Sequence, residues 1–253
     1  MADRLLKIAE GFWNIRGSFK IGGVIDIGTQ ASLAKLASGG FALLDAYTLT
    51  GSVKEEILAL TDGGKAIEAI LNLHPFHTIH VRAIADMFPE AKLYGTKRHI
   101  EKAEDLPWQE LRMEDPELHV QFAEDFIFSI PRGVDFISPN EKLHFSSVLA
   151  FHKASKVLHV DDTLTWLKFP FVGGLSFHLT LKDVLERRPG AVADFRAWAQ
   201  ELIELCEGTS YLCTAHTRPL PPASGEGFDL AEEVRGALKK VEKILVAHER
   251  KHG

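Results

Sequence analysis

Residues 69–88 read AILNLHPFHTIHVRAIADMF. An apolar run over residues 69–71 gives way to three histidines within seven positions, and a stretch with helical spacing follows from Val81 to Met87. This order predicts a buried strand that ends at the histidines and a helix that begins after them. Because imidazole is the commonest protein ligand for zinc and related ions, His74 and His77 are candidate ligands. The alternative is a polar strand-to-helix junction that binds no ion.

Strand-like and helix-like segments continue on both sides of this stretch. A hairpin is expected from two β-like runs around the turn Ser38-Gly39-Gly40, and a charged, proline-containing excursion is expected over residues 98–118. The remaining expectations are helices at 52–60, 183–186, 193–206 and 229–248, and strands at 91–95, 125–130, 143–151, 156–160 and 211–215. This succession predicts one α/β domain over residues 1–253, with two packed sheets flanked by helices.

The composition narrows the function classes. The chain has 253 residues, of which 45% are hydrophobic, and a formal net charge of -6 with both signs interspersed. These values argue against nucleic acid as a partner, and no apolar run is long enough to predict a membrane span. Two cysteines outside any CxxC pattern and an N-terminus without a secretory h-region favour the reducing cytoplasm. A small-molecule substrate or ligand is the expected partner.

Several polar residues stand where predicted strands begin or end. His74 and His77 follow the first of these strands, His144 begins another, and Asp162 and His216 follow two more. Ligands for one ion can come from distant parts of a sequence when strand ends meet at one edge of a sheet. These five residues therefore predict a site at that edge. For Asp162, with Asp161 beside it, the competing interpretation is a carboxylate that caps the turn after the strand.

The chain resembles the metallo-β-lactamase fold superfamily. The segment Lys156-Val157-Leu158-His159-Val160-Asp161-Asp162-Thr163-Leu164 is similar to the strand that runs into the metal-bridging aspartate of that family. Residues 81–94 are similar to its helix and following strand, and they set the register of the motif His-x-His-x-Asp-His. In that register the four motif positions hold Asn72, His74, Phe76 and His77.

The resemblance implies a four-layer αββα sandwich of the metallo-β-lactamase type. It also implies that His144 is the third metal-binding histidine, that Asp162 is the bridging carboxylate, and that His216 is the last histidine. Two departures change the expected chemistry: Asn72 replaces a histidine with a weak ligand, and Phe76 replaces the aspartate with a side chain that binds no metal. We therefore expect a mononuclear site, built from His74, His144 and Asp162 together with His77 and His216, instead of a two-metal centre.

Two functions follow from this interpretation. The first is a metal-dependent hydrolase of a small ester, lactone, thioester or amide, in which Asp162 holds one divalent ion and orients the attacking water. Zinc is the first choice for this ion, followed by iron or manganese. The second is a non-catalytic binding or scaffold protein that keeps the fold and holds no metal.

Other features leave alternatives open. His80 lies three residues beyond His77 and is a replacement ligand if the helix begins early enough. The apolar stretch 168–177 is interpreted either as a loop that walls a substrate pocket or as core packing. His159 alternates with Leu158 and Val160 and is expected to be structural. The apolar stripe of the last helix either covers the core or forms a contact in a homodimer.

Overall fold

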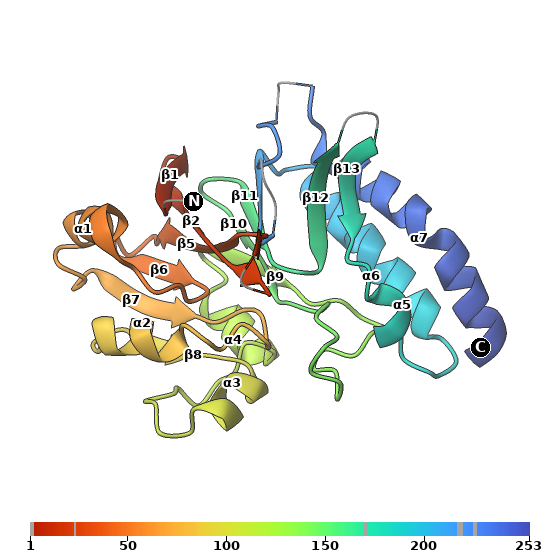
Figure 1. The fold of residues 1–253 in the computed structure, drawn as a ribbon, viewed down its shortest axis with the longest axis horizontal. Coiled ribbons are helices and arrows are strands. Elements are labelled where there is room, and N and C mark those ends of the chain that lie inside the picture. Colours follow the sequence, from red (N-terminus) through yellow and green to blue (C-terminus); the bar gives the residue numbers. More distant parts are fainter. Residues whose placement is uncertain (1–2, 23, 170–171, 217–219, 225–226) are drawn as a thin grey trace.

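Two β-sheets lie face to face between two layers of helices in the computed structural model (Figure 1). The structure describes residues 3–22, 24–169, 172–216, 220–224 and 227–253. Three buried apolar clusters fill the spaces between the layers: the first joins one sheet to its helices, the second joins the two sheets, and the third joins the other sheet to its helices. The expected four-layer αββα sandwich is therefore confirmed.

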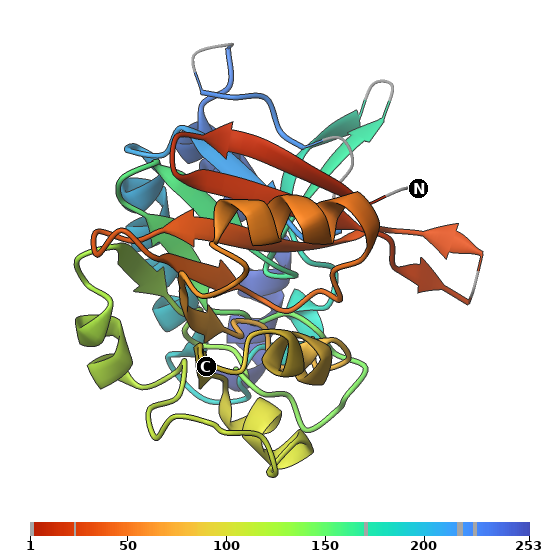
Figure 2. The same cartoon turned by 90° about the vertical axis from the view of Figure 1, so that its left-hand side faces the viewer.

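The first sheet has six strands in the order β1-β2-β5-β6-β7-β8. Its strands are β1 (Arg4–Ala9), β2 (Phe12–Gly17), β5 (Thr29–Lys35), β6 (Phe41–Leu44), β7 (Ile67–Leu71) and β8 (Lys92–Tyr94). β5 and β6 form the antiparallel hairpin that the glycine turn predicts, whereas β6, β7 and β8 are parallel. The helices α1 (Gly51–Leu60) and α2 (Val81–Met87) connect the parallel strands and lie on the outer face of the sheet (Figure 2).

The second sheet has four strands in the order β14-β11-β10-β9. Its strands are β9 (Phe126–Ser129), β10 (Leu149–His152), β11 (Val157–Val160) and β14 (Tyr211–Thr214). β11 and β14 are parallel, with Val160 opposite Thr214, so the residues that follow these two strands leave the sheet side by side. The outer layer consists of α5 (Leu181–Val184), α6 (Ala191–Cys206) and α7 (Leu230–His252).

The elements outside the two sheets are short. α3 (Lys97–Lys102) and α4 (Pro116–Gln121) form the irregular excursion expected over residues 98–118. The hairpin of β3 (Lys20–Ile21) and β4 (Ile25–Asp26) projects from the first sheet (Figure 2). β12 (Leu164–Phe169) and β13 (Val172–Phe177) pair as a second hairpin, on the side of α6 and α7 (Figure 1).

The structure corrects two expectations about local structure. Residues 168–169 and 172–177 belong to the β12–β13 hairpin instead of an apolar loop, because Trp166, Leu175 and Phe177 are buried against the helical layer and hold the two strands in place. Phe171 lies outside the described residues. The strand expected at residues 143–151 begins only at Leu149, because Ser146 and Ser147 bond to Asp135 and Thr163 through their side chains instead of pairing along a strand.

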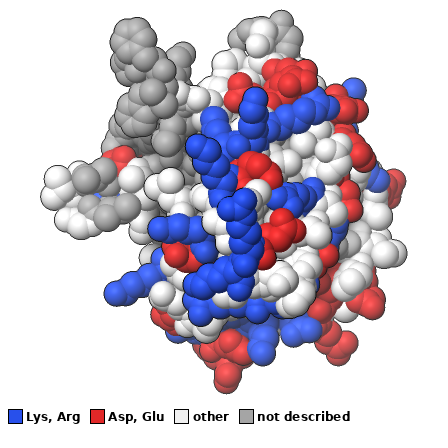
Figure 3. Space-filling model, turned by 90° about the vertical axis from the view of Figure 1, so that its right-hand side faces the viewer, with Lys and Arg blue, Asp and Glu red and all other residues white. Residues whose placement is uncertain are grey.

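The last helix packs one face onto the core and leaves the other in solvent. Leu230, Val234, Val241 and Leu245 are buried at helical spacing, which confirms that the stripe covers the core. The opposite face carries Lys and Arg side chains with Glu side chains among them (Figure 3). Within the described ranges, no helix combines the length and apolar content needed to cross a bilayer.

Candidate metal centre

The five side chains that the sequence predicts as a site meet at one edge of the two sheets. His74 and His77 follow the end of β7, and Asp162 and His216 each lie two residues beyond a strand of the parallel pair β11 and β14. His144 lies in the loop before β10. The predicted convergence is therefore present, with Asp162 at its centre.

Four imidazoles surround the Asp162 carboxylate. Nε2 of His74 and Nε2 of His77 lie 3.2 and 3.6 Å from Oδ2, and Nδ1 of His144 lies 3.7 Å from the same oxygen. Nε2 of His216 lies 3.1 Å from Oδ1. Two ligands of one tetrahedral zinc ion, each at its usual bond length, are about 3.3 Å apart. The spacing around Asp162 is thus of the size that a shared ion requires.

The ligand atoms of His74, His77 and Asp162 form the most compact part of this group, because they all lie within 4.8 Å of one another. The rings of His74 and His77 stack with their centroids 4.1 Å apart. His144 and His216 approach different oxygens of Asp162, so they flank the compact group from two sides.

The hydrogen bonds on the far side of two rings determine which nitrogen of each ring carries the proton. Nδ1 of His216 lies 2.6 Å from the Gly28 carbonyl oxygen, and Nε2 of His144 lies 2.8 Å from the Glu141 carbonyl oxygen. A carbonyl accepts, so in each neutral ring the proton lies at that nitrogen, and the nitrogen facing Asp162 carries a lone pair. A lone pair aimed at a carboxylate needs a cation between them, which is either a proton or a metal ion.

His74 differs from the other three rings. Its Nδ1 accepts a hydrogen bond from the Phe76 backbone N–H at 3.1 Å, so the neutral ring carries its proton on Nε2, toward Asp162. This nitrogen is buried and, among the described residues, makes no hydrogen bond of good geometry. The donor set therefore fits one divalent ion, provided that the His74 proton is displaced.

The charges of the site follow from burial and proximity. Burial opposes ionisation of Asp162, but the facing rings of His74, His216 and His77 outweigh it and hold the pKa of its carboxyl well below the usual range. Burial lowers the pKa of His74 to about 4, with a further contribution from His77. For His77 and His216, the neighbouring carboxylates overcome burial and raise the pKa, well above its ordinary value in His77. Without a metal ion, protons held by His77 and His216 therefore balance the negative charge of the Asp162 carboxylate.

Sequence reasoning missed two carboxylates at the site. The sequence predicts Asp161 as a turn cap, yet its Oδ2 lies 3.3 Å from Nδ1 of His77. Asp45 follows β6 with a positive φ of 58°, and its Oδ1 accepts from the backbone N–H groups of Leu73 and His74. Such a backbone strains a residue other than glycine and often marks a functional position. The sequence signal for Asp45 was its position as an acidic residue directly after β6, the strand that runs parallel to β7.

His159 lies beneath the site. Its Nε2 lies 3.0 Å from Oδ2 of Asp45 and its Nδ1 lies 2.9 Å from the Ser32 hydroxyl, so it ties β11 to the first sheet. The ring is fully buried. Its expected structural role is consistent with these contacts.

The two non-ligating motif positions point to other partners. Nδ2 of Asn72 donates to the Tyr94 carbonyl oxygen at 2.8 Å. The Phe76 ring stacks on His144 with centroids 4.8 Å apart, and the Arg98 guanidinium lies 4.6 Å from the centre of the Phe76 ring. Neither residue is among the described contacts of Asp162.

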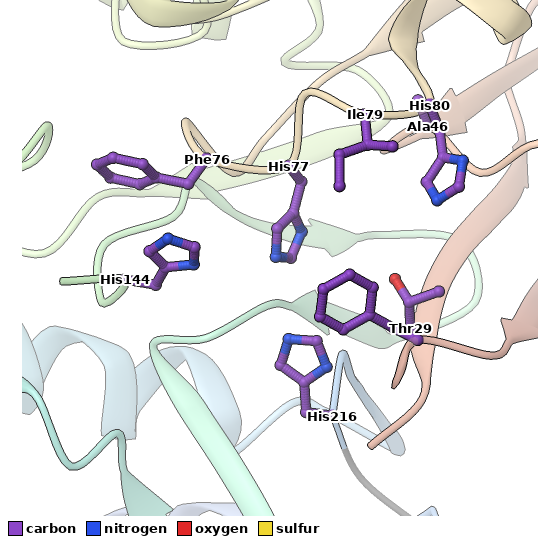
Figure 4. A pocket seen from close by; sticks show the side chains of 9 residues that line it. Thr29, Ala46, Phe76, His77, Ile79, His80, His144 and His216 are labelled. Atoms are coloured by element: carbon purple, nitrogen blue, oxygen red, sulfur yellow. The ribbon is translucent and has the colours of Figure 1, made fainter. Parts of the chain in front are cut away.

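A small cavity opens beside the histidines (Figure 4). Its volume is about 110 Å³, and its lining consists of Phe19, Thr29, Ala46, Phe76, His77, Ile79, His80, His144 and His216. Asp162 lies behind this lining, so His77, His144 and His216 separate it from the cavity. The described residues of β12 and β13 do not line the cavity, so the expectation that stretch 168–177 walls the pocket is not met there.

His80 lines the cavity but lies apart from the carboxylate. It precedes the first residue of α2, and its Nδ1 lies 2.8 Å from the Thr48 hydroxyl. The ring packs against Tyr47 with centroids 5.0 Å apart. Its role as a replacement ligand is therefore not supported by these contacts.

Comparison with known proteins identifies the fold. No family model and no curated protein sequence matches the chain. Solved metallo-β-lactamases superpose along nearly its whole length: DIM-1, exposed to ceftazidime, has a TM-score of 0.61 and 10% identity, and covers 95% of this chain and 98% of its own. The enzyme from Erythrobacter litoralis, with β-mercaptoethanol in its active site, gives 0.60 and 12%, over 94% and 96% of the two chains.

A third solved structure shows the same fold. FIM-1 from Pseudomonas aeruginosa, in its mono-zinc form, has a TM-score of 0.58 and 12% identity, and covers 95% of this chain and 96% of its own. At these identities the likeness establishes the fold, and the chemistry of the site rests on the residues described above.

Proposed function

We propose that this chain, which has the metallo-β-lactamase fold, is a metal-dependent hydrolase with a mononuclear site. The observation that carries the proposal is the convergence of four imidazoles on the carboxylate of Asp162, among which His216 has the Gly28 carbonyl at its other ring nitrogen. Metal-binding histidines are typically held in this way, by an acceptor at the other ring nitrogen. The mono-zinc form of FIM-1 supports a single ion in this fold.

His74, His77 and Asp162 are the residues that we assign to the ion, because their ligand atoms lie within 4.8 Å of one another. His216, whose Nε2 lies 3.1 Å from the other oxygen of the carboxylate, is our choice for a fourth ligand. Three imidazoles and a carboxylate suit zinc, with iron and manganese as the next candidates. A bound divalent ion would lower the pKa of a water molecule and polarise a substrate carbonyl. Asp162 contributes by holding the ion, and its further role in orienting water stays a prediction.

The residue left over is His144, which is the most exposed of the four histidines and lines the cavity. Its Nε2 donates to the Glu141 carbonyl oxygen, so in the neutral ring the lone pair lies on Nδ1, 3.7 Å from Oδ2 of Asp162, where it can accept a proton from the attacking water. We assign it the role of general base.

The cavity suggests the size of the substrate. Its volume of about 110 Å³ is smaller than the roughly 300–1,000 Å³ typical of sites for drug-sized ligands. Phe19, Phe76 and Ile79 supply apolar walls, and the histidines supply the polar side. A small ester, lactone, thioester or amide fits this description.

Metal analysis of the purified protein, coupled to a panel of small carbonyl substrates, tests the proposal. We expect one divalent ion per chain, hydrolysis that stops when a chelator removes the ion, and recovery when the ion is returned. Asp162→Ala should lose both ion and hydrolysis, whereas His248→Ala on α7 serves as the matched control and should keep both. A wild-type protein that stays metal-free when zinc, iron and manganese are supplied would contradict the proposal and favour the non-catalytic binding protein.

A further inference from the structure

Asp161 is the buried carboxylate nearest to the compact ligand group that the proposed function does not use. It lies directly before Asp162, and its side chain is 1% exposed. Its Oδ2 lies 3.3 Å from Nδ1 of His77 and, among the described residues, makes no hydrogen bond of good geometry. The same ring turns Nε2 toward Asp162, at 3.6 Å from Oδ2. His77 therefore lies between two carboxylates, one at each nitrogen.

This arrangement determines which nitrogen of His77 is available to an ion. A carboxylate can only accept, so Asp161 favours the ring with its proton on Nδ1 and a lone pair on Nε2. His216 and His144 are held in the same sense by the neutral carbonyls of Gly28 and Glu141. A charged acceptor binds the ring N–H more strongly and makes the imidazole a better ligand.

Asp161 is itself held by Gln30 of the first sheet. Its Oδ1 accepts from Nε2 of Gln30 at 3.2 Å, and the same amide nitrogen lies 2.9 Å from the Val160 carbonyl oxygen. Nη1 of Arg16 donates to Oε1 of Gln30 at 3.3 Å and to the Thr214 carbonyl oxygen at 2.6 Å. The carboxylate of Asp161 therefore has a fixed orientation before any ion binds.

The neighbouring group of Asp45, His159 and Asp161 is less suited to an ion of its own. His159 uses one ring nitrogen toward Asp45 and the other toward Ser32, so neither is available as a ligand without breaking a buried contact. We therefore look for the role of Asp161 in its contact with His77.

We propose that Asp161, the first residue after β11, is the positioning residue of the metal site. It fixes the tautomer and the direction of the His77 ring so that Nε2 faces the ion. This inference rests on the proposed function, because it requires that an ion is bound.

The experiment compares zinc affinity in the wild type and Asp161→Asn, using competition with a chromophoric chelator. An Asn side chain that keeps its oxygen on Gln30 turns its NH₂ toward His77, which then carries its proton on the wrong nitrogen. We expect zinc affinity to fall by about 10-fold to 100-fold, the usual range for such outer residues. Ser32→Ala is the matched control, because Ser32 is buried in the same network, contacts His159 and leaves His77 untouched.

A second measurement does not depend on the variant being folded. Nitrogen-15 NMR of the zinc-loaded wild type should show His77 with its proton on Nδ1 and zinc on Nε2. The opposite tautomer, or equal zinc affinity in Asp161→Asn and Ser32→Ala, overturns the inference and leaves the hydrolase proposal standing. A wild type that binds no zinc, iron or manganese overturns both.

Discussion

Nε2 of His216 lies 3.1 Å from Oδ1 of Asp162, although the two residues belong to different strand ends. Hydrogen bonds hold both the backbone before His216 and the ring of His216 in place. Arg16 donates to the carbonyl oxygens of Thr214 and Ala215, directly before His216, and the Gly28 carbonyl holds the far nitrogen of the ring. The site is therefore built by contacts between the two sheets, and its properties lead to specific expectations.

Metal affinity should increase with pH across the neutral range. The pKa of His77 is raised well above its ordinary value, because Asp161 and Asp162 outweigh the cost of burial. The metal-free protein therefore holds a proton at neutral pH that an ion must displace, and each displaced proton contributes about a tenfold change in affinity per pH unit. Zinc competition assays at pH 6, 7 and 8 measure this slope. A flat profile would show that no proton is exchanged for the ion.

The amide of Phe76 should report on metal loading. Its N–H donates to Nδ1 of His74, and the ring can offer Nε2 to an ion only after its proton leaves that nitrogen. If the proton moves to Nδ1, the bond from Phe76 is lost, and the amide of this residue should shift and exchange with solvent faster. NMR of the protein with and without zinc tests this expectation. An unchanged Phe76 amide would exclude His74 Nε2 as a ligand.

Restoring the motif carboxylate should not create a second metal site. The side chain of Phe76 stacks on His144 and lies beneath Arg98, with its ring centroid 6.0 Å from that of His74. In Phe76→Asp the new carboxylate should pair with Arg98, so the protein should still bind one equivalent of zinc. Metal content after dialysis measures the stoichiometry, and two equivalents would contradict the account.

Asp45 should make a large contribution to the stability of the folded protein. In Asp45→Ala the backbone N–H groups of Leu73 and His74 lose their acceptor, as does Nε2 of His159. Buried unsatisfied donors cost about 1–3 kcal/mol each, so the free energy of unfolding should fall by roughly 3–5 kcal/mol. Urea denaturation measures the change, with exposed Asp86→Ala as the control that should stay within about 0.5 kcal/mol of the wild type.

Asp45→Asn should instead show a pH-dependent difference from the wild type. Burial and the Asp161 charge raise the pKa of Asp45 to about 6, so the folded protein keeps a proton that the unfolded chain releases near its ordinary value of 3.8. The resulting stabilisation is complete below about 3.8 and is lost as the pH rises through about 6. The metal-free variant lacks this loss, so its stability relative to the wild type should improve between pH 4 and 7. A constant difference would contradict the assignment.

The fold was largely predictable because its signals are local. The apolar run before Asn72, the glycine turn before Phe41 and the stripe of the last helix each give an element of the expected type. The hairpin at residues 164–177 was missed because its glycines suggested a loop, and only the burial of Trp166 and Leu175 against the helices makes it a strand pair.

The site was predictable where strand ends carry candidate ligands, and all five of these side chains meet around Asp162. Asp161 and Asp45 were not assigned, for a common reason. Their roles depend on contacts made through space, from Asp161 to His77 and from Asp45 to the turn after β7. Spacing within one strand cannot reveal such contacts, since they depend on how two sheets approach each other.

The number of ions that the folded protein holds is the most direct test of the account. Calorimetric titration of the metal-free wild type with zinc should give one equivalent, and the same titration of Asp162→Ala should give none while His248→Ala still gives one. Absence of zinc binding in the wild type, or an unchanged stoichiometry in folded Asp162→Ala, would contradict the claim that the histidines around Asp162 form a mononuclear metal site.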